Sequence, residues 1–323
     1  MSEFYEKAFV EIDDALDRAQ QDRSSIDPGK IPQYHIKYLD HVLYGIAPAE
    51  LVIIGADTGR GKSHMANHIV LENAKRGKKV YYFSLEGHRS EVINRWKWGK
   101  ICREYFKNPR GIKMHFGLYE MNSIKGIEEE ERIATEELRE EAKNVFLYDR
   151  KESLNVRNLT QKLSSVSDAD LIVIDHLHYF DMIDDRSEND NISEIMKTVK
   201  SITESPERTP VVLVSHLRKK SNLRGLPDNE DFMGSSNIPK IATTCILLSP
   251  NHENHDIAEG KYATIVRVSK SRAGASTTVA AEMFFDSRSG TYDDAYRFGK
   301  VVSGEYKKLA HEEWPYWARQ ERT

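Results

Sequence analysis

A glycine-rich segment that ends in Lys62-Ser63 holds the residues best suited to chemistry. It covers residues 56–63 and follows the apolar run at residues 51–54. Glycines let backbone N–H groups turn toward a bound anion, and the start of a helix adds partial positive charge. A lysine at the end of such a loop faces the β- and γ-phosphates of a nucleotide, and the following hydroxyl binds Mg²⁺. Lys62 and Ser63 therefore predict a nucleoside triphosphate site of the P-loop type.

The flanks of the loop support this interpretation. An expected buried strand precedes the loop, and residues 64–75 have the apolar spacing of a helix. Ala56 departs from the G-x-x-x-x-G-K-S pattern, because it stands where the first glycine is expected. The simpler alternative is a tight glycine turn that binds nothing. We expect ATP, or another nucleoside or deoxynucleoside triphosphate, to bind with Mg²⁺. The residues expected to contact it are Ala56, Asp57, Thr58, Gly59, Arg60, Gly61, Lys62, Ser63 and His64.

Asp175 ends a second apolar run, at residues 171–174. Such a run predicts a strand buried on both faces, which places its terminal carboxylate at the same sheet edge as the P-loop. This is the Walker B pattern, and it makes Asp175 the second expected Mg²⁺ residue beside Ser63. Four apolar residues before an aspartate are a common string, so the prediction depends on the P-loop that precedes it.

Three further apolar runs end in residues that could act on phosphates. Glu86 could take a proton from an attacking water, and His216 could contact a γ-phosphate oxygen. Lys270 and Arg272 follow a later run and could reach phosphates as an arginine finger does. On spacing alone, a surface glutamate, a structural histidine and a solvated basic turn are the simpler interpretations.

The bulk composition narrows the class of protein. The chain has 323 residues and a formal net charge of −4, so one or two domains are expected and any nucleic-acid contact needs a local basic strip. Cys102 and Cys245 lie far apart, which argues against a disulfide scaffold or a cysteine-rich zinc site. The sequence has no long apolar run and no signal-peptide profile at its start. We expect a cytoplasmic protein of a bacterium or a phage-infected host, with no membrane contact.

Apolar runs alternate with helical stretches along most of the chain. This pattern predicts an α/β fold with a mainly parallel sheet, helices on both faces and antiparallel strands late in the sequence. We expect an N-terminal helix and linker at 1–33, a core at 34–298 and a tail at 299–323. The helix, at residues 3–22, is amphipathic, and it could pack on its own domain or on a neighbouring subunit. The expected strands are at 51–54, 80–85, 145–148, 171–174, 211–214, 244–248 and 263–268.

Together these motifs resemble the RecA-like motor domain of hexameric DnaB-family replicative helicases, and most of all the phage helicase-primase and mitochondrial Twinkle branch. The resemblance runs from about Lys37 to Asp294 and rests on motifs in family order. Besides the P-loop these are Phe83-Ser84-Leu85-Glu86, Asp175-His176, Ser215-His216-Leu217 and Lys270-Ser271-Arg272-Ala273-Gly274.

The resemblance implies roles for the residues that spacing left open. Glu86 matches the family's catalytic base and His216 its γ-phosphate sensor. Lys270 and Arg272 match the pair that acts in trans on the neighbouring subunit's nucleotide. The family forms hexameric rings that translocate on single-stranded DNA, here expected in the 5′–3′ direction. The helix at 3–22 corresponds to the family's linker helix, which grips the adjacent subunit.

Two departures from the family accompany Ala56. Met233 stands at an arginine of the family in the segment 231–238. Nothing in the sequence corresponds to the primase half or the helical N-terminal domain of family members, which argues against primase coupling. A primase or another replisome protein is a candidate partner. Both a full replicative helicase and a stripped-down relative stay open.

The expected DNA contacts lie in a loop that follows His216. Its basic residues are suited to the phosphate backbone of a single strand, although a solvated surface loop is the alternative. The loop around residues 181–191 is acidic, with Arg186 as its one basic residue, and is poorly suited to DNA. The candidate DNA-binding residues are Arg218, Lys219, Lys220 and Arg224.

Two other classes share this core fold. A RecA/RadA-type recombinase would form helical filaments on DNA, and the patterns around His216 and Lys270 argue against it. A KaiC-like, non-motor ATPase would assemble into rings without affinity for nucleic acid.

Overall fold

The computed structural model describes residues 10–183, 186–218, 225–251, 260–275, 278–286, 291–292 and 297–320. The chain divides into two compact units, Met1–Ile31 and Pro32–Thr323, and each is described by itself.

The first unit contains the helix α1 (Ile12–Ser25) and a short 3₁₀ turn, η1 (Pro28–Lys30). The sequence predicts a helix at residues 3–22. The observed helix continues three residues further, and residues 3–9 lie outside the described ranges. The hydroxyls of Ser24 and Ser25 donate to carbonyls of the preceding turn, which satisfies backbone acceptors at the helix end. Ile12 and Leu16 are 71% and 59% exposed.

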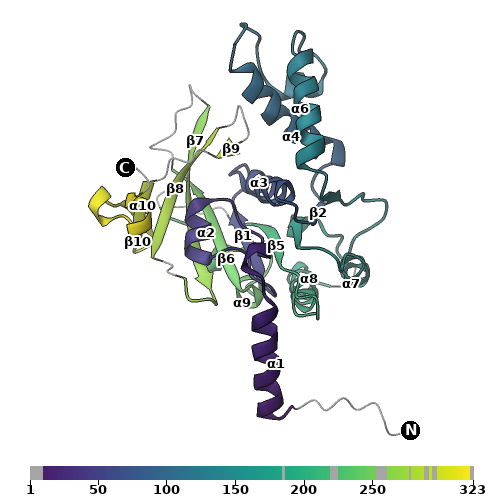
Figure 1. The fold of residues 1–323 in the computed structure, drawn as a ribbon, viewed down its shortest axis with the longest axis vertical. Helices are drawn as coiled ribbons and strands as arrows, with labels where there is room; N and C mark the ends of the chain where they lie inside the picture. Colours follow the sequence, from purple (N-terminus) through teal and green to yellow (C-terminus); the bar gives the residue numbers. More distant parts are fainter. Residues whose placement is uncertain are drawn as a thin grey trace. The chain divides into compact units, whose positions relative to one another are not determined.

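The second unit is built on one large sheet (Figure 1). Within the described residues its order is β11-β10-β8-β7-β6-β1-β5-β4-β2-β3, and β9 pairs with β8. Strands β6, β1, β5, β4, β2 and β3 are parallel, and β7, β8, β10 and β11 join antiparallel. This confirms the predicted mainly parallel sheet with late antiparallel strands. The strands are β1 (Leu51–Ala56), β2 (Val80–Ser84), β3 (Val145–Leu147), β4 (Leu171–Asp175), β5 (Val211–His216), β6 (Thr244–Pro250), β7 (Lys261–Ser271), β8 (Val279–Asp286), β9 (Thr291–Tyr292), β10 (Arg297–Val302) and β11 (Glu305–Lys308).

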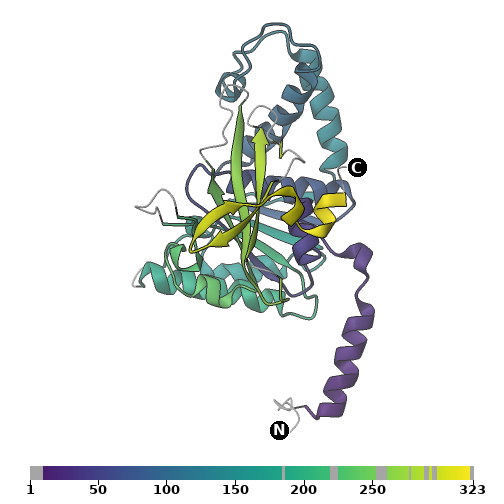
Figure 2. The same cartoon turned by 90° about the vertical axis from the view of Figure 1, so that its left-hand side faces the viewer.

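Helices cover both faces of the parallel part (Figures 1 and 2). Helices α2 and α3 share one apolar core with one side of the sheet, and α7, α8 and α9 share the other. No helix in the described ranges is long and apolar enough to cross a membrane. The remaining elements of this unit are α2 (Lys37–Leu43), α3 (Lys62–Lys75), α4 (Arg89–Tyr105), α5 (Phe116–Glu120), α6 (Glu128–Glu141), α7 (Val156–Ser164), η2 (Leu177–Tyr179), α8 (Glu188–Thr203), η3 (Asn229–Asp231), α9 (Ile238–Ile241), η5 (His311–Glu313) and α10 (Tyr316–Gln320).

The pleat of β1 explains its unbroken apolar sequence. Val52 and Ile54 belong to the core under α3, whereas Leu51 and Ile53 belong to the core on the opposite face. All six residues of β1 are buried. Successive side chains of a strand point to opposite faces, so a strand covered on both sides needs apolar residues throughout. This burial fixes the strand whose end carries the glycine-rich loop.

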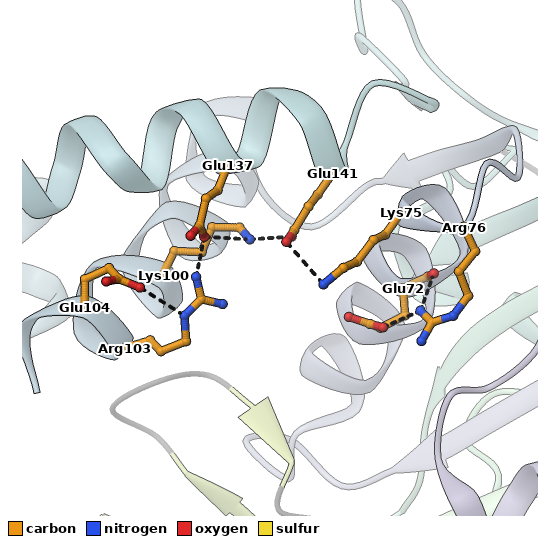
Figure 3. Close-up of polar contacts among 8 residues, drawn as sticks. All are labelled: Glu72, Lys75, Arg76, Lys100, Arg103, Glu104, Glu137 and Glu141. Carbon is orange, nitrogen blue, oxygen red and sulfur yellow. Dashed lines mark hydrogen bonds and ion pairs between the residues drawn. The ribbon is translucent and has the colours of Figure 1, made fainter. Parts of the chain in front are cut away.

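Helices α4, α5 and α6 form a small module with its own apolar cluster, which includes Trp98, Ile101 and Ala134. Charged side chains connect this module to α3 (Figure 3). The Lys100 ammonium, with a side chain 9% exposed, pairs with Glu141 and lies 3.6 Å from Glu137. Glu141 also pairs with Lys75 of α3 at 3.3 Å. The helix that begins at the P-loop is therefore tied at its far end to the module.

Residues of the expected tail add to the core. Leu309, Trp314 and Ala318 are buried in the apolar cluster that also contains residues of α2. The Trp317 ring stacks on His41 of α2 with centroids 4.2 Å apart. Strands β10 and β11 extend the sheet at its antiparallel end.

Candidate nucleotide-binding and hydrolysis site

The glycine-rich loop joins β1 to α3 with the backbone that its glycines permit. Gly59 and Gly61 have φ values of 74° and 81°, a region that side chains disfavour. The first turn of α3 closes when the Met65 N–H donates to the Gly61 carbonyl at 2.9 Å. Ala56 is the last residue of β1 and pairs with His216 in extended conformation. An alanine fits this slot because the strand, and not the turn, sets its backbone.

Lys62 begins α3 and is buried, with 5% of its surface exposed. Burial lowers the pKa of the Lys62 ammonium, and the charges of Glu86, Asp175 and Asp57 oppose that shift. Burying a cation is costly unless an anion compensates it. The arrangement therefore suits a bound polyanion such as a triphosphate.

Asp175 lies at the end of β4, where it pairs with Ser84 of β2. The Tyr82 hydroxyl donates to Asp175 Oδ2 at 3.3 Å, whereas Oδ1 is buried without a hydrogen-bond partner among the described residues. Burial raises the pKa of Asp175 to about 6, against the effects of Ser63 and Lys62. An unsatisfied carboxylate oxygen beside a serine hydroxyl fits Mg²⁺, which prefers oxygen ligands and takes few from the protein.

These residues surround one cavity of about 480 Å³. It brings together Lys62, Ser63, Glu86 and Asp175, which the sequence predicted as separate motifs. In the described part of the chain, no group of three or more His, Cys, Asp and Glu side chains could hold a metal by itself. The rest of the lining is Thr58, Gly59, Gly61, His64, Asn67, Tyr82, Ser84, Gly87, Glu91, Val92, Arg95 and Tyr179.

A second cavity of about 160 Å³ also borders the glycine-rich loop. Arg60 lines it, together with the rings of Tyr262, Phe285 and Tyr292. The Tyr292 hydroxyl donates to the Gly61 carbonyl at 3.2 Å. These aromatic residues were not predictable from the sequence, because they reach the loop only through the pairing of β7, β8 and β9. An apolar, aromatic cavity next to a phosphate loop is suited to the base of a nucleotide.

Three histidines lie together, and one of them, His176, lies beside Glu86. The ring of His176 is 4.2 Å from that of His216 and 5.8 Å from that of His178, centroid to centroid. Burial lowers the pKa of His176 to about 3, with the charges of His216, Lys62 and His178 adding. Burial and Lys62 lower the pKa of His216 to about 4. The sequence predicted His216 but gave no role to His176 or His178.

Lys270 and Arg272 lie at the opposite ends of the strands from the glycine-rich loop. Strand β7 runs antiparallel, so the Arg272 N–H donates to Thr243 at the level where β1 begins. Five residues of β1 separate that level from Ala56, a distance of roughly 16 Å along the strand. The Lys270 ammonium donates to the carbonyl of Ala242 at 2.7 Å and to those of Pro239 and Lys240 at the end of α9. The fold therefore does not bring this pair to the chain's own P-loop.

The candidate DNA-binding residues are only partly described. Arg218 is exposed, and its N–H donates to the Asp231 carbonyl at 2.7 Å. Lys219, Lys220 and Arg224 lie outside the described residues.

The fold and the site define a RecA-like P-loop nucleoside triphosphatase. The model of the DnaB-like helicase C terminal domain family matches residues 33–294, and the chain belongs to this family. This confirms the resemblance that the ordered motifs indicate.

Individual relatives agree with this assignment. The replicative DNA helicase DnaB of Mycoplasma genitalium is 21% identical over 277 residues, which cover 80% of this chain. This chain spans 57% of that relative's length. A solved structure of an isolated ATPase domain has a similar fold, with a TM-score of 0.68 and 19% identity over 88% of this chain and 98% of that domain. A DnaB-like replicative helicase studied with primase gives a TM-score of 0.67 and 20% identity over 87% of this chain and 68% of its own.

Proposed function

We propose that this chain hydrolyses ATP and uses the energy to move along single-stranded DNA as a replicative-type helicase. The observation that carries the proposal is the cavity in which Lys62, Asp175 and Glu86 meet, in a chain of the DnaB-like helicase family. We expect 5′–3′ movement, as in the helicases that the sequence resembles. A replicative role would place the protein in the cytoplasm of a bacterium or an infected host.

The residues of the two cavities have separate roles in ATP binding and hydrolysis. Lys62 and the loop N–H groups bind the β- and γ-phosphates, and the aromatic second cavity receives the base. Ser63 and Asp175 would hold Mg²⁺, which supplies positive charge for the transferring phosphoryl group when bound. Glu86 accepts a proton from the water whose oxygen attacks the γ-phosphorus. The bond to the bridging oxygen breaks, and ADP leaves with that oxygen while His216 contacts the released phosphate.

Lys270 and Arg272 would complete the site of a neighbouring copy. The pair lies at the ends of the strands opposite the glycine-rich loop, so one chain does not bring the pair and its own phosphate loop together. This position supports action in trans. Repeating such a contact between copies generates a ring, which we propose to be a hexamer. The helix α1 would grip the adjacent subunit, and Arg218, Lys219, Lys220 and Arg224 would contact DNA in the channel.

Hydrolysis stimulated by single-stranded DNA tests the activity. Lys62→Ala should reduce kcat by at least about a hundredfold, since the loss of a phosphate contact removes transition-state stabilisation. Lys308→Ala, at an exposed lysine of β11, is the matched control and should hydrolyse ATP normally. Absence of DNA-stimulated hydrolysis and of strand separation in the unmodified chain would exclude the helicase function.

Mixed assemblies test the contribution in trans. Arg272→Ala should retain nucleotide binding but lose turnover. Mixing Lys62→Ala with Arg272→Ala subunits should restore part of the activity, because some interfaces then combine two intact half-sites. If mixed rings form and stay inactive, Arg272 does not act on the neighbour's nucleotide.

The form of the assembly distinguishes the alternative classes. Closed rings with no affinity for DNA would favour a KaiC-like role, and helical filaments on DNA would favour a recombinase.

A primase is a candidate partner, because a structurally similar DnaB-like helicase is known with one. Co-sedimentation of the assembled chain with the primase of its own replication system tests this contact.

A further inference from the structure

The side chain of His176 is held in one orientation by the turn that follows it. Its Nδ1 accepts a hydrogen bond from the His178 N–H at 3.3 Å and caps the 3₁₀ turn η2. An imidazole that accepts at Nδ1 carries its proton at Nε2. The ring is completely buried, so surrounding atoms and not solvent fix its direction.

The Nε2 atom of His176 faces the carboxylate of Glu86. The distance from Nε2 to Glu86 Oε2 is 3.6 Å, and Nε2 has no hydrogen-bond partner in the described part of the chain. The Glu86 side chain is 48% exposed and lies beyond the end of β2. A half-exposed glutamate at a strand end has several rotamers, so a general base in this place needs a neighbour that selects one.

The same ring also contacts the expected γ-phosphate sensor. His176 and His216 pack edge to face, with centroids 4.2 Å apart and an angle of 80° between the rings. Tyr179, which lines the main cavity, also packs edge to face on His176, with ring centroids 4.6 Å apart. A change in the position of His216 would therefore press on the ring that faces Glu86.

We propose that His176 is a positioning residue that directs the Glu86 carboxylate toward the attacking water and couples it to His216. The proposal deepens the proposed function and rests on it, because it requires Glu86 to act as the base. His176 does not contact the substrate. Its Nε2–H donates to Glu86 Oε2 when the site closes around the nucleotide, as catalytic hydrogen bonds often tighten only in the loaded state.

Two substitutions separate positioning from a structural role. In His176→Gln the amide nitrogen reaches about as far as Nε2, whereas in His176→Asn the amide reaches only the level of Nδ1. Positioning predicts that His176→Gln keeps kcat within about threefold and that His176→Asn loses at least about tenfold. The opposite order would show that capping of η2 is the role of His176, and equal behaviour of the two variants would also overturn the proposal.

Three further measurements complete the test. Affinity for a fluorescent, non-hydrolysable ATP analogue should change less than about twofold in both variants, because His176 acts through Glu86. In a Glu86→Gln background, His176→Asn should cause no additional loss of kcat, and a further loss would contradict coupling.

His88→Asn is the matched control, because the exposed His88 ring accepts the Ser90 N–H at the same 3.3 Å. Unmodified chain without any hydrolysis would instead refute the proposed function itself.

Discussion

Gly55 and Ala56 are the last two residues of β1, where the strand leads into the phosphate loop. Gly55 is the residue that the fold requires to be glycine, because a Cβ atom there would lie 2.8 Å from the Phe232 ring and 2.9 Å from Leu217. Ala56 occupies the position where the motif expects glycine, and its extended strand backbone accepts a side chain. The glycine needed for close packing is thus one residue earlier than the motif predicts.

Gly55→Ala should destabilise the second unit by about 1–3 kcal/mol, because an inserted methyl group forces neighbouring side chains out of a packed core. Chemical denaturation gives the free energy of unfolding. Gly225→Ala is the control, because a Cβ atom there meets nothing within 4 Å and should leave that free energy almost unchanged. Equal stability of the Gly55 variant and the unmodified chain would mean that Phe232 moves aside without cost.

At the level of elements, α3 joins the phosphate loop to the module of α4, α5 and α6. Lys100 is the buried centre of this connection, between carboxylates of α6. Removing it leaves Glu137 and Glu141 close together without their shared cation. Breaking a buried ion pair by deleting one partner costs more than deleting an exposed pair.

Lys100→Met should lower the free energy of unfolding by about 2–4 kcal/mol, since the remaining carboxylates lose a buried partner. Lys143→Ala removes the exposed pair with Glu140 at 3.8 Å and should cost less than about 0.5 kcal/mol. Denaturation of both variants measures the difference, and hydrogen exchange should show faster opening of α4 and α6 in Lys100→Met alone. Equal costs would show that Lys100 contributes no more than a surface lysine.

The sequence predicted those parts of the site that follow from strands buried on both faces. Apolar runs before Asp175 and Glu86 located two strand ends, and the parallel sheet brings such ends to one edge. The role of Lys270 as a cap of α9 was not predictable, because its three carbonyl partners are specified by tertiary packing. The same holds for Tyr262 and Phe285, which reach the phosphate loop only once distant strands pair. No role for His176 was predictable, because an aspartate followed by a histidine is a common pair.

At the level of the whole molecule, α1 forms a unit of its own. Its apolar side chains Ile12 and Leu16 remain largely exposed. The core of the second unit consists of residues from position 34 onward. Stability of the ATPase fold and assembly of subunits are therefore expected to depend on different parts of the chain.

Deletion of residues 1–31 should leave the midpoint of thermal unfolding of the second unit within a few degrees, because its core is intact. The assembled mass in the presence of nucleotide should fall, since the deletion removes the proposed grip on the neighbour. Analytical ultracentrifugation measures this mass, and Leu16→Asp in the full chain should act in the same direction. Unchanged assembly in both variants would contradict the role proposed for α1.

The antiparallel direction of β7 has a consequence for the stoichiometry of active sites. If Lys270 and Arg272 act in trans, as proposed, each copy carries one half-site beside the glycine-rich loop and the complementary half at the opposite ends of the strands. The number of complete sites then equals the number of contacts between copies. A linear, open assembly of n copies has n − 1 complete sites and one unused half-site at each end. A closed ring of n copies has n complete sites. Turnover per copy would therefore rise with assembly and reach its maximum only at closure.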